Sequence, residues 1–554
     1  MRRIVLGLLL ATATGCSTST ATNPAPAVPT TTASSTASAV QPPDVLPMPK
    51  NPFVLTEPVK TETPPSIDAP TLSSLSIAWP ASAPKGLPPA PGSCKQFIDR
   101  KPAAKAPACG TNDEAIAALD AAMSDSDLAK RDALLAALET CSGFAPGFIH
   151  SLRVELAPAP CADGFNEALL KKMPANVPGS VQQALMGQAI AAWANRIGIG
   201  MPKPPKGANK DAIIKFLKSD VAPWLQAQLA LLKSTSDVGL KLSGYAKGII
   251  AVEVGAAAMR VVDEVRSSPI PEEWSKDNEL KDAYYGALDQ VLTPLKDMGR
   301  NASLAGLREY ADLGVLHDGR VDRARGLLSK LYGGRRIDAL ESLIVPELES
   351  FSPASASERL LSRLPTFQAA VFFGDSLATD EKAFRARLEQ GIAPQVRTKL
   401  TDPPAALVKP YALARAKLAQ RYWRAVDVDQ SAWLASRKAE ESPEMKGLLS
   451  TMIALRNGPD GAAEMMRRAG QGSTVSTEAC DVLAQQQTGA VAAMVKFNAA
   501  RIRDIAAPVD AKAAYWKDVA SRYRAAAAVL SDAKHKAAAE DFAKAADAVA
   551  DSIK

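Results

Sequence analysis

The stretch from Pro271 to Arg336 establishes the helical character of the chain; it reads PEEWSKDNELKDAYYGALDQVLTPLKDMGRNASLAGLREYADLGVLHDGRVDRARGLLSKLYGGRR. Its apolar side chains recur at steps of three and four residues, which is typical of stripes along helices. The stripes comprise Tyr284, Leu288, Val291, Leu292 and Leu295, then Leu304, Leu307 and Ala311, and then Val321, Ala324, Leu327, Leu328 and Leu331. Turns at Asp318–Gly319 and Gly333–Gly334 interrupt the pattern. Because short helices joined by glycine turns cannot bury their apolar faces alone, we expect them to stack on neighbouring helices.

The same helical pattern extends over most of the chain. No alternating run long enough to build a sheet occurs in the sequence, and aromatic residues make up only 5% of it. The longest apolar portion, Gly248–Val262, contains Glu253 and Arg260 and is too short to span a membrane, so we interpret it as a buried helix. We therefore predict an all-α fold built of helical hairpins or a solenoid.

The first sixteen residues carry an export signal. Two arginines precede a short apolar run, and the small residues Ala13, Thr14 and Gly15 then precede Cys16. This arrangement resembles the lipobox of bacterial lipoproteins, in which the cysteine receives fatty acyl chains such as palmitate. The resemblance implies a signal peptide at 1–15, a lipid anchor on Cys16 and, because Ser17 rather than Asp follows, a location at the outer membrane. An ordinary secretory signal with an incidental cysteine is the alternative.

Residues 16–92 are predicted to be a disordered tether. They hold 17 of the 41 prolines, together with many Ser, Thr and Ala residues and few charges. Such a composition buries too little apolar surface to offset the entropy of ordering. Proline-rich chain is extended at about 3.1 Å per residue, so the tether would span on the order of 100–200 Å.

The remaining cysteines indicate an oxidising compartment. Four of them lie close together: Cys94, Cys109, Cys141 and Cys161. An even cluster in an exported chain is typical of two disulfides, for which three connectivities are possible. Their spacing contains no CxxC pair, which argues against zinc. Cys480 is left over, and we interpret it as a buried thiol.

The breaks in the helical pattern divide the folded body into three parts. The clearest break is the segment 200–207, which is rich in proline and lysine. We expect an N-terminal helical subdomain with the cysteines at 93–200, a central helical domain at 208–350 and a C-terminal domain at 351–554.

The C-terminal domain resembles the tetratricopeptide repeat (TPR) family. Trp516, Val519, Ala520 and Tyr523 have the spacing of helix A of that repeat, and Ala538, Phe542 and Ala545 have the spacing of helix B. The gap between the two helices is longer than in the family, and no regular 34-residue period is present. The resemblance implies TPR-like hairpins that bind other proteins.

Two short blocks resemble the GDSL (SGNH) esterases. Gly374, Asp375, Ser376 and Leu377 match the nucleophile block, and Asp532 and His535 match the DxxH block. In that family serine is the nucleophile and histidine its base. The family also requires a central parallel sheet, which the helical pattern does not provide. We therefore expect no enzymatic activity and keep a periplasmic esterase as an alternative.

One window is strongly basic. Its cations are Arg320, Arg323, Arg325, Lys330, Arg335 and Arg336, and Asp322 is the only acid among them. Such runs are usually solvated helix faces with ion pairs, but a site for anionic envelope polymers or an acidic partner is the sharper alternative. With three histidines and no metal or phosphate-binding motif, we expect no metal and no cofactor. The aromatic residues are not interleaved with the basic ones, which argues against nucleic acid.

Taken together, these patterns predict an outer-membrane lipoprotein facing the periplasm or the cell surface. Its helical body would act as a protein–protein interaction scaffold in an envelope complex of motility or secretion type.

Overall fold

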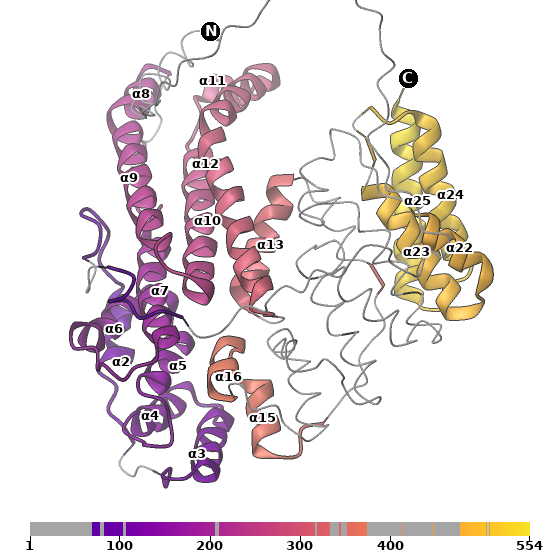
Figure 1. The fold of residues 1–554 in the computed structure, drawn as a ribbon. Helices are drawn as coiled ribbons and strands as arrows, with labels where there is room; N and C mark the ends of the chain where they lie inside the picture. The colour runs from indigo at the N-terminus through magenta and orange to yellow at the C-terminus, as the bar shows by residue number, and fades with distance from the viewer. Residues whose placement is uncertain are drawn as a thin grey trace, which may run out of the picture.

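The computed structural model describes residues 69–77, 82–103, 107–204, 210–315, 318–332, 343–344, 352–373, 477–505, 507–508 and 510–553, together with Leu413, Arg421 and Gly447. Throughout these residues the regular elements are helices packed on helices, and none is a strand. The predicted all-α, solenoid-like fold is therefore confirmed (Figure 1).

The described helices follow one another along the chain in three groups, and the second, called the long group, contains the two longest of them, α10 and α12. The first group is α2 (Lys95–Ile98), α3 (Asn112–Ser124), α4 (Leu128–Leu138), α5 (Phe148–Leu156), α6 (Ala162–Lys171) and α7 (Gly179–Arg196). The long group is α8 (Lys210–Phe216), α9 (Ala222–Gly239), α10 (Gly244–Arg266), α11 (Glu272–Ser275), α12 (Asn278–Asp312) and α13 (Gly319–Tyr332). The last group is α15 (Ala356–Arg363), α16 (Thr366–Phe373), α22 (Glu478–Gln486), α23 (Gly489–Ile505), α24 (Ala513–Ala527) and α25 (Ala533–Ser552).

Polar side chains mark where several helices begin. Thr111 and Ser355 form capping boxes with Glu114 and Glu358 at the starts of α3 and α15. Asp277 accepts hydrogen bonds from two backbone N–H groups at the start of α12. These contacts satisfy donors that have no partner within the helix, which fixes the position of each start.

Helix α10 is the centre of the long group, with α7, α9, α12 and α13 packed around it. Figure 1 shows α9, α10 and α12 side by side. Glycines allow α10 and α12 to approach closely: a Cβ on Gly306 would lie 2.6 Å from Val252 Cγ2 and 3.0 Å from the Val252 nitrogen. Gly255 faces Gly299 and Ser303 in the same way. The interface therefore depends on positions that carry no side chain.

This interface gives a prediction with an internal control. Gly306→Ala is expected to lower the free energy of unfolding by about 1–3 kcal/mol, because the new methyl group meets the backbone of α10. Gly286→Ala, on the same helix, meets nothing within 4 Å and is expected to raise that free energy by up to about 1 kcal/mol. Urea denaturation of both variants checks this. Equal shifts of the same sign would contradict the close approach.

The segment 278–312 differs from the expectation of short helices. It is one continuous helix of 35 residues with Pro294 inside it. Proline removes one backbone hydrogen bond, but Tyr284, Leu288, Leu292 and Leu295 are all buried in the core shared with α10. Since packing of the apolar face stabilises helices more than local propensity does, α12 continues through the proline.

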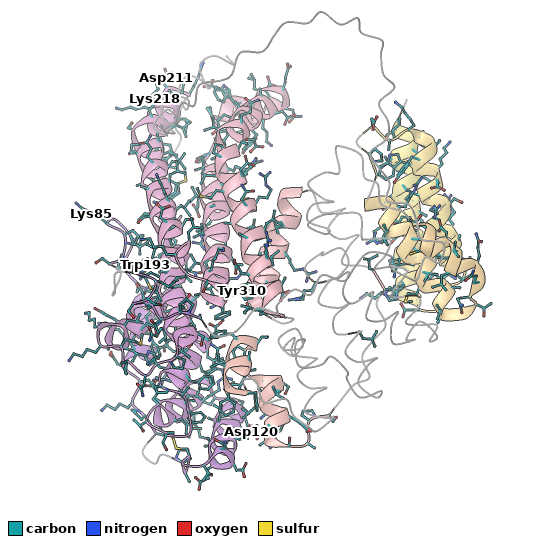
Figure 2. All side chains as sticks on the ribbon, viewed as in Figure 1. Lys85, Asp120, Trp193, Asp211, Lys218 and Tyr310 are labelled. Atoms are coloured by element: carbon teal, nitrogen blue, oxygen red, sulfur yellow. A yellow bond between two sulfur atoms is a disulfide. The ribbon has the colours of Figure 1, made fainter. Side chains whose placement is uncertain are left out.

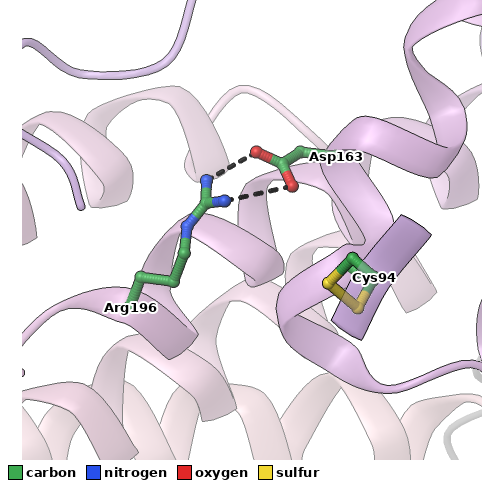
Figure 3. Close-up of a disulfide and its surroundings, with 4 residues drawn as sticks. Cys94, Asp163 and Arg196 are labelled. Carbon is green, nitrogen blue, oxygen red and sulfur yellow. Dashed lines mark hydrogen bonds and ion pairs between the residues drawn. A yellow bond between two sulfur atoms is a disulfide. The ribbon is translucent and has the colours of Figure 1, made fainter. Parts of the chain in front are cut away.

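Two disulfides join the N-terminal helices, as predicted from the cysteine cluster. Cys94 pairs with Cys161 and Cys109 with Cys141, with Cα–Cα distances of 5.2 and 5.8 Å. Figure 3 shows the first of these with the ion pair that Arg196 at the end of α7 makes to Asp163 on α6 (2.5 Å). The disulfide joins the start of α2 to the start of α6, and the ion pair joins α6 to α7.

Part of the predicted tether belongs to the folded body. Residues 69–77 lie against α7, where the Leu72 N–H donates to Gln182 Oε1 (3.2 Å) and Gln183 Nε2 donates to the Pro70 carbonyl (2.7 Å). Leu72 and Ile77 are buried in the core of the long helices. The predicted boundary at residue 92 is therefore too late. The two apolar side chains supply the buried surface that the composition of the whole segment did not suggest.

The other two predicted boundaries do not separate packing units either. α7 lies before the break at 200–207 and shares its core with α9 and α10 after it. α15 lies after the predicted boundary at residue 350 but packs on α3, where Arg359 and Arg363 pair with Asp120 (2.7 and 2.9 Å). Figure 2 places Asp120 beside α15. Long-range packing thus returns the chain to its N-terminal helices.

The C-terminal hairpin is formed by α24 and α25, as the TPR-like spacing predicts, but the register of helix B is shifted. Val519, Ala520 and Tyr523 of α24 are fully buried. On α25 the buried face consists of Ala539, Ala543, Ala546 and Ala550, whereas Ala538 and Phe542 are half-buried and Ala545 is exposed. Small side chains face α24 because they let the two helices approach closely.

None of the described helices combines the length and the apolar character needed to cross a membrane.

Candidate functional site

The basic residues at the start of α13 are bound by carboxylates from other helices. Arg320 forms an ion pair with Glu155 of α5, and its Nε lies 3.5 Å from Glu253 of α10. Arg323 contacts both oxygens of Glu253, one of them at 3.3 Å. Glu253 is fully buried. These two arginines therefore hold three helices together, and the anion-binding expectation gains no support from them.

The other members of the basic window are Arg325, Lys330, Arg335 and Arg336. Arg325 is half-buried and makes an interaction within the chain. Lys330 lies on α13, and Arg335 and Arg336 fall outside the described residues. Asp322 pairs with Arg421 (2.7 Å). Arg320, Arg323 and Arg325 are thus engaged within the chain.

The ion pairs belong to a larger buried polar cluster, which we define as Glu155, Glu253, Asp318, Arg320 and Tyr245. Gln188 of α7 donates to the second oxygen of Glu155 (2.9 Å), and Arg320 Nη1 lies 3.5 Å from the hydroxyl of Tyr245. Burial opposes the charged form of Arg320, but Glu155, Tyr245, Tyr310 and Asp318 together outweigh it and raise the pKa of Arg320 well above its usual range. Burial raises the pKa of Asp318, although Arg320 acts in the opposite direction.

Aromatic rings close one side of this cluster. Tyr245 stacks on Phe367 of α16 with ring centroids 4.1 Å apart, and it meets Tyr310 of α12 edge to face at 5.8 Å. Figure 2 places Tyr310 between the long helices and α16. Burial raises the pKa values of both tyrosines well above their usual value. The Arg320–Glu155 pair beside these rings has little exposure to solvent, with 12% and 7% of the two side chains exposed, and low exposure strengthens an ion pair.

Of the candidate esterase residues, the structure describes Asp532 and His535. Asp532 caps α25 by accepting a hydrogen bond from the His535 backbone N–H (2.8 Å), and its Oδ1 lies 2.9 Å from His535 Nδ1. Both side chains are exposed. Ser376 lies outside the described residues, and the described residues contain no strand that could form the nucleophile turn of that family. A helix cap accounts for the DxxH block.

The C-terminal helices contain a second buried polar group. Arg501 of α23 is fully buried, with its guanidinium carbon 3.5 Å from the ring centre of Phe542. Its Nη1 lies 3.4 Å from the hydroxyl of Tyr523, which donates to Asp504 (2.8 Å). Burial raises the pKa of Tyr523 well above its usual value, and the charge of Asp504 adds to the shift.

The described residues contain no group of three His, Cys, Asp or Glu side chains that could hold a metal ion. Cys480 is fully buried on α22. The lipidation candidate Cys16 lies outside the described residues. Comparisons with protein-family models, curated proteins and solved structures find no match to this chain.

One signal in the sequence pointed to the buried cluster without revealing its members. Glu253 and Arg260 interrupt the apolar segment Gly248–Val262, and buried charges require partners. Arg260 Nη1 donates to the Asn195 carbonyl (3.0 Å) at the end of α7, where a cation is favourable. The partners of Glu253 lie 70 residues away in the sequence, beyond the reach of a local pattern.

Proposed function

We propose that this chain is an outer-membrane lipoprotein whose helical body is a protein–protein interaction scaffold in an envelope complex. The observation that carries the proposal is the pair of disulfides, because stable disulfides occur in proteins exported to oxidising compartments. The lipobox-like sequence that ends at Cys16 supports a lipid anchor. The stacked helices support a scaffold, because such folds offer extended surfaces to partners.

The membrane location of the protein can be tested by substituting two adjacent residues. Cys16→Ala is expected to abolish incorporation of labelled palmitate and to release the protein from membranes, because acyl chains supply the membrane affinity. Ser17→Asp is the matched control: by resemblance to other lipoproteins it should keep the lipid and move the protein to inner-membrane fractions. Fractionation of both strains on a density gradient measures this. An unchanged outer-membrane location of Cys16→Ala would refute the anchor.

The scaffold role is tested in the same strains. A photo-cross-linking amino acid is placed at Leu128 or Leu240, whose side chains are 63% and 69% exposed. The same group at the fully buried Leu292 is the control. We expect defined adducts with envelope proteins from the exposed positions, and fewer of them in Cys16→Ala. Identical adduct patterns from exposed and buried positions would contradict a binding surface.

A further inference from the structure

Asn498 of α23 holds the backbone of a segment that lies far from it in the sequence. Its side chain is fully buried. Oδ1 accepts a hydrogen bond from the Ile344 N–H (2.7 Å), and Nδ2 donates to the Ile344 carbonyl (2.9 Å), across 154 residues of sequence. These two bonds satisfy both backbone groups of Ile344, as a neighbouring antiparallel strand would.

Apolar side chains complete the contact. Leu343 is 6% exposed and belongs to the cluster that includes Leu483 of α22 and Val495 of α23. Ile344 packs between this cluster and a second one built on Phe497 and Ala526. Neither Leu343 nor Ile344 is in a helix.

The helices that surround Leu343 and Ile344 also pack on one another. α22 packs on α23, α23 on α24 and α24 on α25. Leu343 and Ile344 therefore lie against helices that also pack on one another. Because the Asn498 side chain is buried, losing its two hydrogen bonds to Ile344 without replacement is unfavourable, so the site favours occupation by a backbone N–H and carbonyl.

We propose that the surface formed by α22, α23 and α24 around Asn498 is a binding site for extended peptide segments with two consecutive aliphatic residues. Leu343–Ile344 occupies this site in cis, and a partner polypeptide of the same chemistry binds by displacing it. The two hydrogen bonds made by the Asn498 side chain recognise extended backbone of any sequence. The two apolar clusters favour the aliphatic pair.

This inference rests on the proposed scaffold role and states the chemistry of the partner. It has a regulatory consequence, because a segment on the same chain competes for the site intramolecularly, at a concentration that does not depend on the amount of protein. A partner segment must therefore bind more tightly than Leu343–Ile344 or arrive when that pair has left the site.

The test uses the full chain and a fluorescent heptapeptide with the sequence of residues 341–347, ESLIVPE. In the variant Leu343→Asp/Ile344→Asp the cis segment is expected to leave the site, since a buried unpaired carboxylate is unfavourable. The peptide should then bind at least about tenfold more tightly to the variant than to the wild type. Fluorescence anisotropy measures both affinities. Leu343→Gly/Ile344→Gly adds no charge and replaces the first variant if that variant does not fold. It should also bind the peptide more tightly than the wild type does.

Two changes isolate the contact to Asn498. A peptide N-methylated at its isoleucine lacks the donor to Oδ1 and should bind about fivefold more weakly. Adding Asn498→Ala to the emptied variant should remove the difference between the two peptides. Equal binding of both peptides to the emptied variant, or equal binding of ESLIVPE to emptied and wild-type chains, would overturn the inference. Either result leaves the anchoring and cross-linking experiments unaffected, so the two proposals fail separately.

Discussion

Arg320→Met is expected to lower the free energy of unfolding by about 3–5 kcal/mol, because it leaves the buried carboxylate of Glu155 without a cation and removes one of the two arginines that face Glu253. Glu155 and Glu253 are 7% and 0% exposed, and Arg320 lies between them with 12% of its side chain exposed. Methionine keeps much of the apolar stem, so the loss would arise mainly from charge. Hydrogen exchange of peptides from α5, α10 and α13 measures the loss of stability in these helices. This measurement does not require the whole chain to unfold in one step.

Two further variants separate ion pairing from other causes. Arg308→Met, at an exposed position of α12, should change the same free energy by less than about 0.5 kcal/mol. Arg320→Met/Glu155→Gln should be more stable than Arg320→Met, because the unpaired charge of Glu155 is removed along with its partner. If Arg320 served a surface anion site instead, Arg320→Met would leave stability unchanged.

The helical class of this chain could be predicted from sequence because it depends on local periodicity. Tyr284, Leu288, Leu292 and Leu295 are buried along one face of α12, as their spacing indicates. The set of disulfide cysteines could also be predicted, because an even cluster of cysteines behind a sequence that resembles an export signal indicates disulfides. Their pairing was not, because three connectivities satisfy the same sequence.

Contacts between distant segments could not be predicted. Arg320 finds Glu155 across 165 residues, and the basic window offered only Asp322 as a local acid. The docking of residues 69–77 depends on Gln182 and Gln183, which reach backbone groups more than 100 residues earlier. Asn498 gave no signal at all, because its role is to bind backbone atoms that every residue has. Such sites depend on the fold and not on a motif.

Tyr523→Ala is expected to lower the free energy of unfolding of the C-terminal helices by about 3–5 kcal/mol. Tyr523 is fully buried, and its ring lies 5.4 Å from that of Phe542 and 6.4 Å from that of Phe497. Truncation therefore leaves a cavity between α23, α24 and α25, and it also removes the hydrogen bond to Asp504.

Two controls separate the contributions of the ring and the hydroxyl of Tyr523. Tyr523→Phe keeps the ring and should cost about 1–3 kcal/mol, which is the effect of losing the hydrogen bond to a buried carboxylate. Tyr515→Ala, the same substitution at a half-buried position of α24, should cost less than Tyr523→Ala because less packed surface is lost. Hydrogen exchange in α24 and α25 measures the loss in free energy of unfolding for each of the three variants. Equal losses for Tyr523→Ala and Tyr515→Ala would mean that the hairpin is not held together at Tyr523, and the TPR-like spacing would then have no structural role.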